Sequence, residues 1–140
     1  MSLLNKLNSR FRIGASEPAA SESDLQELKQ FSQIELPVEF VSIVREMTEV
    51  EILVDSDKYF RIWSPSGCIE MNEEYEIQNH IPNSLAIGDD EGGSALIVMT
   101  GNKGFGLYKV GFGDLDVDDA KYISASLEEL LVNGVGAEVV

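Results

Sequence analysis

The chain of 140 residues is 44% hydrophobic, and its 25 acidic residues outnumber 10 basic ones, which gives a formal net charge of −15. This length and apolar content predict a single folded domain with a core of its own. The negative charge excludes a surface for phosphate backbones, so we expect no nucleic-acid ligand. A basic protein partner, or solubility alone, would explain the charge.

Cysteine content and hydropathy indicate the compartment. Cys68 is the only cysteine, so no disulfide can form within the chain, and we expect a reducing cytoplasm. No run of about 18 apolar residues is present to span a membrane. Residues 1–14 lack the apolar centre of a secretory signal. We therefore expect a cytoplasmic protein that does not enter a membrane.

Residues 1–22 are predicted as a basic N-terminal helix followed by a linker. Three cations precede the first acid of the chain: Lys6, Arg10 and Arg12. A mitochondrial address or a membrane-surface helix would share this pattern, but three cations bind membranes weakly, which favours a frayed or docked helix. Residues 15–23 are small and polar without periodicity, as is typical of a linker. Residues 23–140 are predicted as one domain.

Two helices are predicted after the linker. Ser23 and Gln26 have the spacing of a capping box, and the apolar residues that follow recur at helical spacing: Leu25, Leu28 and Phe31. Pro37 suits the first turn of the second helix, where its missing N–H is not needed. The second helix has one apolar face, made of Phe40, Val41, Ile43, Val44 and Met47.

From residue 50 the apolar period changes to two, which predicts strands. The strand-like segments are residues 51–54, 58–63, 68–71, 84–88, 94–99, 104–110 and 121–124. Residues 72–80 allow two interpretations, a short helix capped by Asn72 or an irregular loop. Glycines in residues 89–93 and 100–104 predict turns between strands.

A C-terminal helix is predicted from a second capping box, formed by Ser126 and Glu129. Gly134 is expected to end this helix. Helices before and after a run of strands, without alternation of strand and helix, predict an α+β fold. We expect one mainly antiparallel sheet, flanked by N-terminal helices and a C-terminal helix.

Metal and cofactor motifs are incomplete. Asp114, Asp116 and Asp118 have the spacing of the first ligands of a calcium loop, but Asp119 replaces its glycine and Ala125 its final glutamate. One histidine and one cysteine are too few for a zinc site. The glycine-rich stretches lack the endings of phosphate-binding loops. We therefore predict no metal and no cofactor.

Catalytic groups do not converge in the sequence. Ser94, His80 and Cys68 show no pattern of nucleophile and base. Two pairs of carboxylates could perform acid–base chemistry, Glu73 with Glu76 or Asp89 with Glu91, so a carboxylate-dependent hydrolase stays as a remote alternative. The favoured interpretation is that the protein is not an enzyme.

The acidic residues are unevenly distributed. No lysine or arginine lies between Arg61 and Lys103, so the acids of this stretch have no neighbouring base in the sequence. We predict that two such blocks bind a partner through Glu70, Glu73, Glu74, Glu76, Asp89, Asp90, Glu91, Asp114, Asp116, Asp118 and Asp119. Gly88, Gly92 and Gly93 are predicted to form the turn that displays the central acids.

Three segments, in this order, resemble the SUKH superfamily of Smi/Knr type over residues 24–133. They are "LPVEFVSIVREM", "IPNSLAIGDDEGGSALIVM" and "ISASLEELLVNG". The resemblance implies a single sheet flanked by helices and no known catalysis. Many bacterial members are immunity proteins that neutralise a toxin domain, often a nuclease, and fungal members are regulators that act by protein contacts.

Charge and resemblance together predict a bacterial immunity protein whose acidic loops bind a basic, nuclease-type toxin domain. A nuclease needs a cationic groove for its phosphate substrate, and clustered carboxylates would be attracted to that groove. The alternative is a regulatory or scaffold protein that binds cellular partners.

Overall fold

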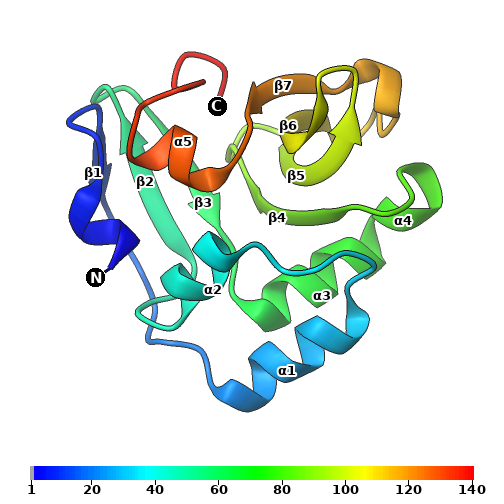
Figure 1. Ribbon diagram of the computed structural model, residues 1–140, viewed down its shortest axis with the longest axis horizontal. Coiled ribbons are helices and arrows are strands. Elements are labelled where there is room, and N and C mark those ends of the chain that lie inside the picture. Colours follow the sequence, from blue (N-terminus) through cyan, green and yellow to red (C-terminus); the bar gives the residue numbers. More distant parts are fainter. Residues whose placement is uncertain (1) are drawn as a thin grey trace.

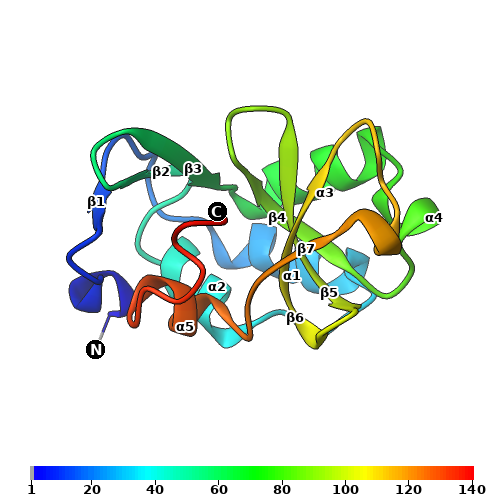
Figure 2. The ribbon, with the colours of Figure 1, turned by 90° about the horizontal axis from the view of Figure 1, so that it is seen from above.

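The computed structural model describes residues 2–140, and its centre is one antiparallel sheet whose seven strands follow one another in chain order. The strands are β1 (Phe11–Ile13), β2 (Val50–Val54), β3 (Lys58–Ile62), β4 (Leu85–Asp89), β5 (Ser94–Gly101), β6 (Gly104–Gly111) and β7 (Lys121–Ser124). Figure 2 shows β1, β2 and β3 at one end of the molecule and β5, β6 and β7 at the other. The two halves are joined where β3 meets β4 at only two paired positions, Arg61 with Asp89 and Ile62 with Gly88.

Helices surround the curled sheet, so the fold is α+β as predicted (Figure 1). The helices are α1 (Glu22–Phe31), α2 (Val38–Val44), α3 (Pro65–Glu74), α4 (Ile77–His80) and α5 (Leu127–Leu131), with single turns of 3-10 helix at η1 (Leu3–Lys6) and η2 (Val117–Asp119). Helix α1 packs on α3, and α3 packs on β4. Strands and helices share one core, which includes Phe40, Phe60 and Tyr108. These contacts hold the end of α3 beside the strands that carry the central acids.

The prediction of a strand at residues 68–71 is wrong, because these residues lie in α3. The preceding "SPSG" is the start of that helix. The Ser64 hydroxyl accepts a hydrogen bond from the Gly67 amide at 3.0 Å, and Pro65 occupies the first helical position. Ser-Pro is a helix start as well as a turn signal, since proline at the first position loses no intrahelical bond. Asn72 lies inside α3 and does not cap a helix.

The N-terminal segment contributes to the sheet. Strand β1 pairs with β2, and Leu3, Leu4 and Phe11 are buried in the core. The expected N-terminal helix is a single turn, η1. Within the expected linker, Glu17 forms an isolated bridge with Thr48. A division of the chain at residue 22 stays a prediction.

Helix α1 begins two residues earlier than expected. The Ser21 hydroxyl, and not that of Ser23, accepts a hydrogen bond from a backbone amide, that of Asp24, at 3.0 Å. At the other end of the chain, the Ser126 hydroxyl accepts from the Glu129 amide at 3.1 Å, so the cap predicted for α5 is confirmed.

Two matched substitutions can test whether Ser21 caps α1. Ser21→Ala should lower the free energy of unfolding by about 1 kcal/mol, because it removes the side-chain acceptor for an amide of the first turn. Ser23→Ala should change it by less than about 0.5 kcal/mol, as is usual for an exposed helical position. Urea unfolding of both variants measures the difference. Equal effects would show that Ser21 is not the cap.

Candidate functional site

Three of the predicted partner-binding residues lie around one hollow of about 610 Å³. Glu70 comes from α3, Asp89 from the end of β4 and Glu91 from the turn that follows. We call this hollow the acidic groove, and its lining residues are Glu49, Arg61, Trp63, Ser64, Ser66, Gly67, Glu70, Met71, Asp89 and Glu91.

Two glutamates that were not predicted belong to the charge arrangement of this site: Glu49 lines the groove, and Glu51 forms an ion pair with Arg61. Antiparallel pairing places Glu51 opposite Arg61 on one side and Asp89 opposite Arg61 on the other. The Arg61 guanidinium lies 3.0 Å from a Glu51 carboxylate oxygen, 3.6 Å from one of Glu91 and 3.9 Å from one of Glu49. The signal was present in the sequence, because a hairpin that joins residues 51–54 to 58–63 brings Glu51 near Arg61.

The acidic groove keeps an excess of negative charge, because a single guanidinium faces several carboxylates. Burial, followed by the hydrogen bond and charge of Glu51, raises the pKa of Glu91 against the opposing effect of Arg61. For Arg61, burial lowers the pKa, but the neighbouring carboxylates outweigh this and the net direction is upward. Carboxylates held close together favour an additional cation, so the groove is suited to a lysine or arginine side chain.

Asp89 and Asp90 also hold the turn that follows β4. Asp89 accepts hydrogen bonds from the Trp63 indole at 2.7 Å and from the Glu91 amide at 2.8 Å. Asp90 accepts from the amides of Gly92 at 2.8 Å and Ser94 at 2.9 Å. Burial alone would raise the pKa of Asp90, but these amides and the nearby Lys109 lower it. Both aspartates therefore have a structural role besides their charge.

Of the three glycines predicted to form the turn, two lie in it and one lies in a strand. Gly93 adopts a left-handed conformation in the turn, with φ of 102°, and Glu91 does so with φ of 58°. Gly92 lies between them in the same turn. Gly88 lies within β4, so its assignment to the turn is wrong.

The remaining predicted acids come near this turn through Phe112. The Phe112 amide donates a hydrogen bond to the Gly93 carbonyl at 2.9 Å, and its ring lies 4.3 Å from the ring of Tyr75, at the end of α3. Figure 2 shows the end of α3, the β4–β5 turn and the connection from β6 to β7 along the same edge of the molecule. Three acidic segments far apart in the sequence thus adjoin one another. We call them together the acidic face.

The carboxylates of the acidic face differ in how many contacts they make within the protein. Glu73 and Glu74 are exposed at the end of α3, and Glu76 accepts a hydrogen bond from the Asn79 amide group at 3.0 Å. Asp116 caps η2 through the Asp118 amide at 2.9 Å. Asp114 and Asp119 line a hollow of about 430 Å³ together with Lys109 and Lys121. This last block therefore has bases near it, because Lys121 follows Asp119 by two residues and strand pairing places Lys109 opposite Lys121.

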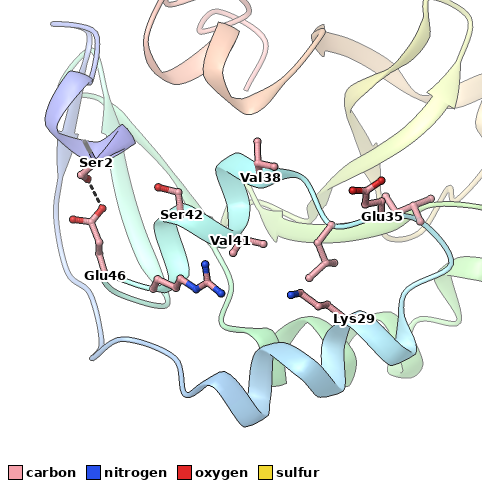
Figure 3. A pocket seen from close by; sticks show the side chains of 10 residues that line it. Ser2, Lys29, Glu35, Val38, Val41, Ser42 and Glu46 are labelled. Carbon is pink, nitrogen blue, oxygen red and sulfur yellow. Dashed lines mark hydrogen bonds between the residues drawn. The ribbon is translucent and has the colours of Figure 1, made fainter.

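A further hollow, of about 930 Å³, lies between α1, α2 and η1 and is lined by charges of both signs (Figure 3). Lys29 points into it from α1, and Val41 faces it from α2. Ser2 donates a hydrogen bond to Glu46 at one end. Its mixed lining shows no preference for one charge.

Of the candidate catalytic groups, Cys68 and His80 line none of these hollows, whereas Ser94 lines the hollow of about 430 Å³, and Asp89 and Glu91 line the acidic groove. Cys68 is buried in α3, and burial, followed by the charge of Glu49, raises the pKa of its thiol well above the usual value. His80 is exposed at the end of α4. Among residues 2–140, no group of three or more histidine, cysteine or acidic side chains is arranged to hold a metal ion. The same part of the chain contains no helix with the length and hydropathy needed to cross a membrane.

Comparison with known proteins gives one finding. The model of the SMI1/KNR4 family (SUKH-1) matches residues 19–133, which include α1 to α5 and strands β2 to β7. No individual curated protein matches the sequence.

Proposed function

The chain belongs to the SMI1/KNR4 family (SUKH-1), and from this membership and the acidic face we propose that it is a non-catalytic protein-binding domain. In this proposal it is a cytoplasmic immunity protein of a bacterium, and it neutralises a basic, nuclease-type toxin domain. Family membership itself supports an immunity or a regulatory role. The choice of a basic partner is ours and rests on charge.

The observation that carries this proposal is the meeting of three acidic segments at Phe112, next to the acidic groove. A field summed over adjoining carboxylates attracts a cationic surface over a longer range than scattered charges do. The groove adds a place where one cationic side chain can be surrounded by Glu49, Glu70 and Glu91. Steering would increase the association rate, and the groove would contribute to specificity.

A regulatory protein that binds cellular partners is the second candidate, and the mixed lining of the hollow between α1 and α2 favours it. Such a surface does not select a basic partner. The neighbouring genes distinguish the two roles. A toxin gene directly upstream favours immunity, and a housekeeping context favours regulation.

Association kinetics test the proposed partner chemistry. Replacing Glu70, Glu73 and Glu74 with glutamine should lower the association rate with the basic domain encoded next to this chain by about tenfold at low salt. These glutamates are exposed on α3 and make no side-chain hydrogen bond or ion pair within residues 2–140. The variant is preferable to substitution of Asp89 or Asp90, because it leaves the turn intact. The wild-type rate should also fall steeply between low and physiological salt.

A matched control has the same change in net charge at other positions. Replacing Glu17, Glu27 and Glu128, all exposed, with glutamine should lower the rate much less. Stopped-flow measurements at several salt concentrations give both rates. A salt-independent rate that neither variant changes would show that the acidic face only keeps the protein soluble.

A further inference from the structure

A small pocket of about 160 Å³ lies where the β5–β6 hairpin, the start of α2 and the segment before α5 meet. Its lining residues are Glu35, Pro37, Glu39, Val98, Phe105, Gly106, Leu107, Ala125, Ser126 and Leu127. It shares none of them with the acidic groove. Its position and chemistry are therefore separate from those of the proposed immunity site.

The pocket has an apolar interior with an exposed aromatic wall. Val98, Leu107 and Leu127 are buried beneath it. Phe105 is 57% exposed, and Val38, next to Pro37 in the chain, is 76% exposed. Large apolar side chains exposed beside a pocket are typical of the anchoring point of a protein interface.

The rim of this pocket carries two carboxylates without a partner. Within residues 2–140, neither Glu35 nor Glu39 forms an ion pair or a side-chain hydrogen bond, whereas Glu49, Glu51 and Glu91 all lie close to Arg61. Figure 3 shows Glu35 on the loop before α2 and Val38 on the first turn of that helix. A cation placed at this rim would be attracted without displacing an existing partner.

The volume limits what can enter. A cavity of about 150 Å³ lined by apolar side chains is large enough to hold a benzene molecule. A pocket of 160 Å³ is therefore filled by one side chain of the size of leucine, methionine or phenylalanine. A whole helix or a larger ligand would need more space.

We propose that this pocket docks a partner segment in which one large apolar side chain is followed by lysine or arginine. The apolar side chain enters between Phe105 and Leu107, and the cation lies at Glu35 and Glu39. A second copy of this chain is a poor occupant, because its net charge of −15 repels the same carboxylates. This inference does not depend on the immunity role, since a regulatory partner could present the same pair of residues.

Three blocked tetrapeptides test the proposal: acetyl-Gly-Phe-Lys-Gly-amide, its Ala-Lys analogue and its Phe-Glu analogue. Each is titrated into the uniformly ¹⁵N-labelled full chain. We expect saturable shifts at the amides of Phe105, Leu107 and Ala125 with the Phe-Lys peptide. Both analogues should bind there at least about tenfold more weakly, because each lacks one of the two recognised groups.

Variants of the protein test the apolar contact and the charged contact separately. Phe105→Ala and the double substitution Glu35→Gln with Glu39→Gln should each weaken binding of the Phe-Lys peptide at these amides. Tyr59→Ala removes an exposed aromatic ring elsewhere and should leave binding unchanged. Any of three results would overturn the proposal. They are equal shifts with all three peptides, the absence of a saturable shift at the pocket, and shifts of the same amides with protein concentration alone.

Discussion

Replacing Gly88 with alanine should lower the free energy of unfolding by about 3 kcal/mol or more, at the upper end of the usual cost of overpacking. A methyl carbon at Gly88 would lie 2.1 Å from the Arg61 carbonyl oxygen and 3.4 Å from the Ile62 Cα. All of these neighbours belong to the backbone of β3, which cannot rotate away as a flexible side chain can. Strands β3 and β4 pair at only two positions, and Gly88 is one of them. The substitution would therefore separate the two halves of the sheet at their junction.

Gly113→Ala is the matched control for this prediction. An added Cβ at Gly113 meets no atom within 4 Å, and its backbone lies outside the left-handed region. Its stability should stay within about 1 kcal/mol of the wild type. Urea unfolding of the two variants gives the comparison. Equal stability of the two proteins would show that β3 can move away from Gly88 at little cost.

The same junction positions the acidic groove. Arg61 lies on β3 and Asp89 on β4, directly opposite each other and next to Gly88. A displacement of β4 would move Asp89 and Glu91 away from Arg61 and from Glu70 on α3. The absence of a side chain at position 88 is thus a condition for the charge arrangement that we propose as the binding site.

Strands β2 to β7 and the cap of α5 could be predicted from the sequence because their signals are local, whereas β1 was expected as part of a helix. Apolar residues alternate in β2, the continuous apolar run of β5 is buried on both faces, and Ser126 precedes the helix that it caps. Helix α3 was not predicted because its sequence pattern is compatible with a helix and with a turn followed by a strand. "SPSG" is typical of a turn and of a helix start, and "CIEM" alternates over too few residues to separate a strand from a helix. Packing on β4 decides in favour of the helix.

The candidate site was predicted in part for a similar reason. Glu70, Asp89 and Glu91 were found because no base is near them in the sequence. Glu49 and Glu51 were missed because their contact with Arg61 depends on the register of β2 and β3. Lys109 approaches the block of Asp114 to Asp119 in the same way, because the pairing of β6 with β7 places it opposite Lys121, which follows Asp119 by two residues. Charge counted along a chain describes composition, whereas the pairing of strands determines which charges become neighbours.

The Asn72 side chain makes two hydrogen bonds to the backbone of β4, as a neighbouring strand would. We expect its substitution to lower the stability of the fold. Asn72 is fully buried in α3. Its side chain accepts a hydrogen bond from the Ala86 amide at 3.0 Å and donates one to the Ala86 carbonyl at 2.8 Å. It also donates to the Cys68 carbonyl at 2.7 Å. The two bonds to Ala86 lie beyond the two positions paired with β3, where the register between β4 and β5 shifts.

Asn72→Asp should lower the free energy of unfolding at neutral pH by about 3 to 5 kcal/mol. An ionised carboxylate cannot donate to the Ala86 and Cys68 carbonyls, and it places an unpaired charge in the core. Burial would raise the pKa of the new carboxyl above its unfolded value of about 3.9. The deficit should therefore be smallest below pH 4 and grow as the pH rises through the folded pKa.

The matched control is Asn79→Asp, which makes the same chemical change at an exposed position on α4. Asn79 donates only to the exposed Glu76, so its loss should cost less than about 1 kcal/mol. Asn72→Ala separates the two causes in the core, since it loses the donated hydrogen bonds, and the one accepted from the Ala86 amide as well, but adds no titrating group. Urea unfolding relative to the wild type between pH 4 and 8 should give a growing deficit for Asn72→Asp and a constant one for Asn72→Ala. A constant deficit in both would show that the carboxylate reaches solvent, and a small deficit in both would show that β4 does not need the side chain at position 72 as a partner.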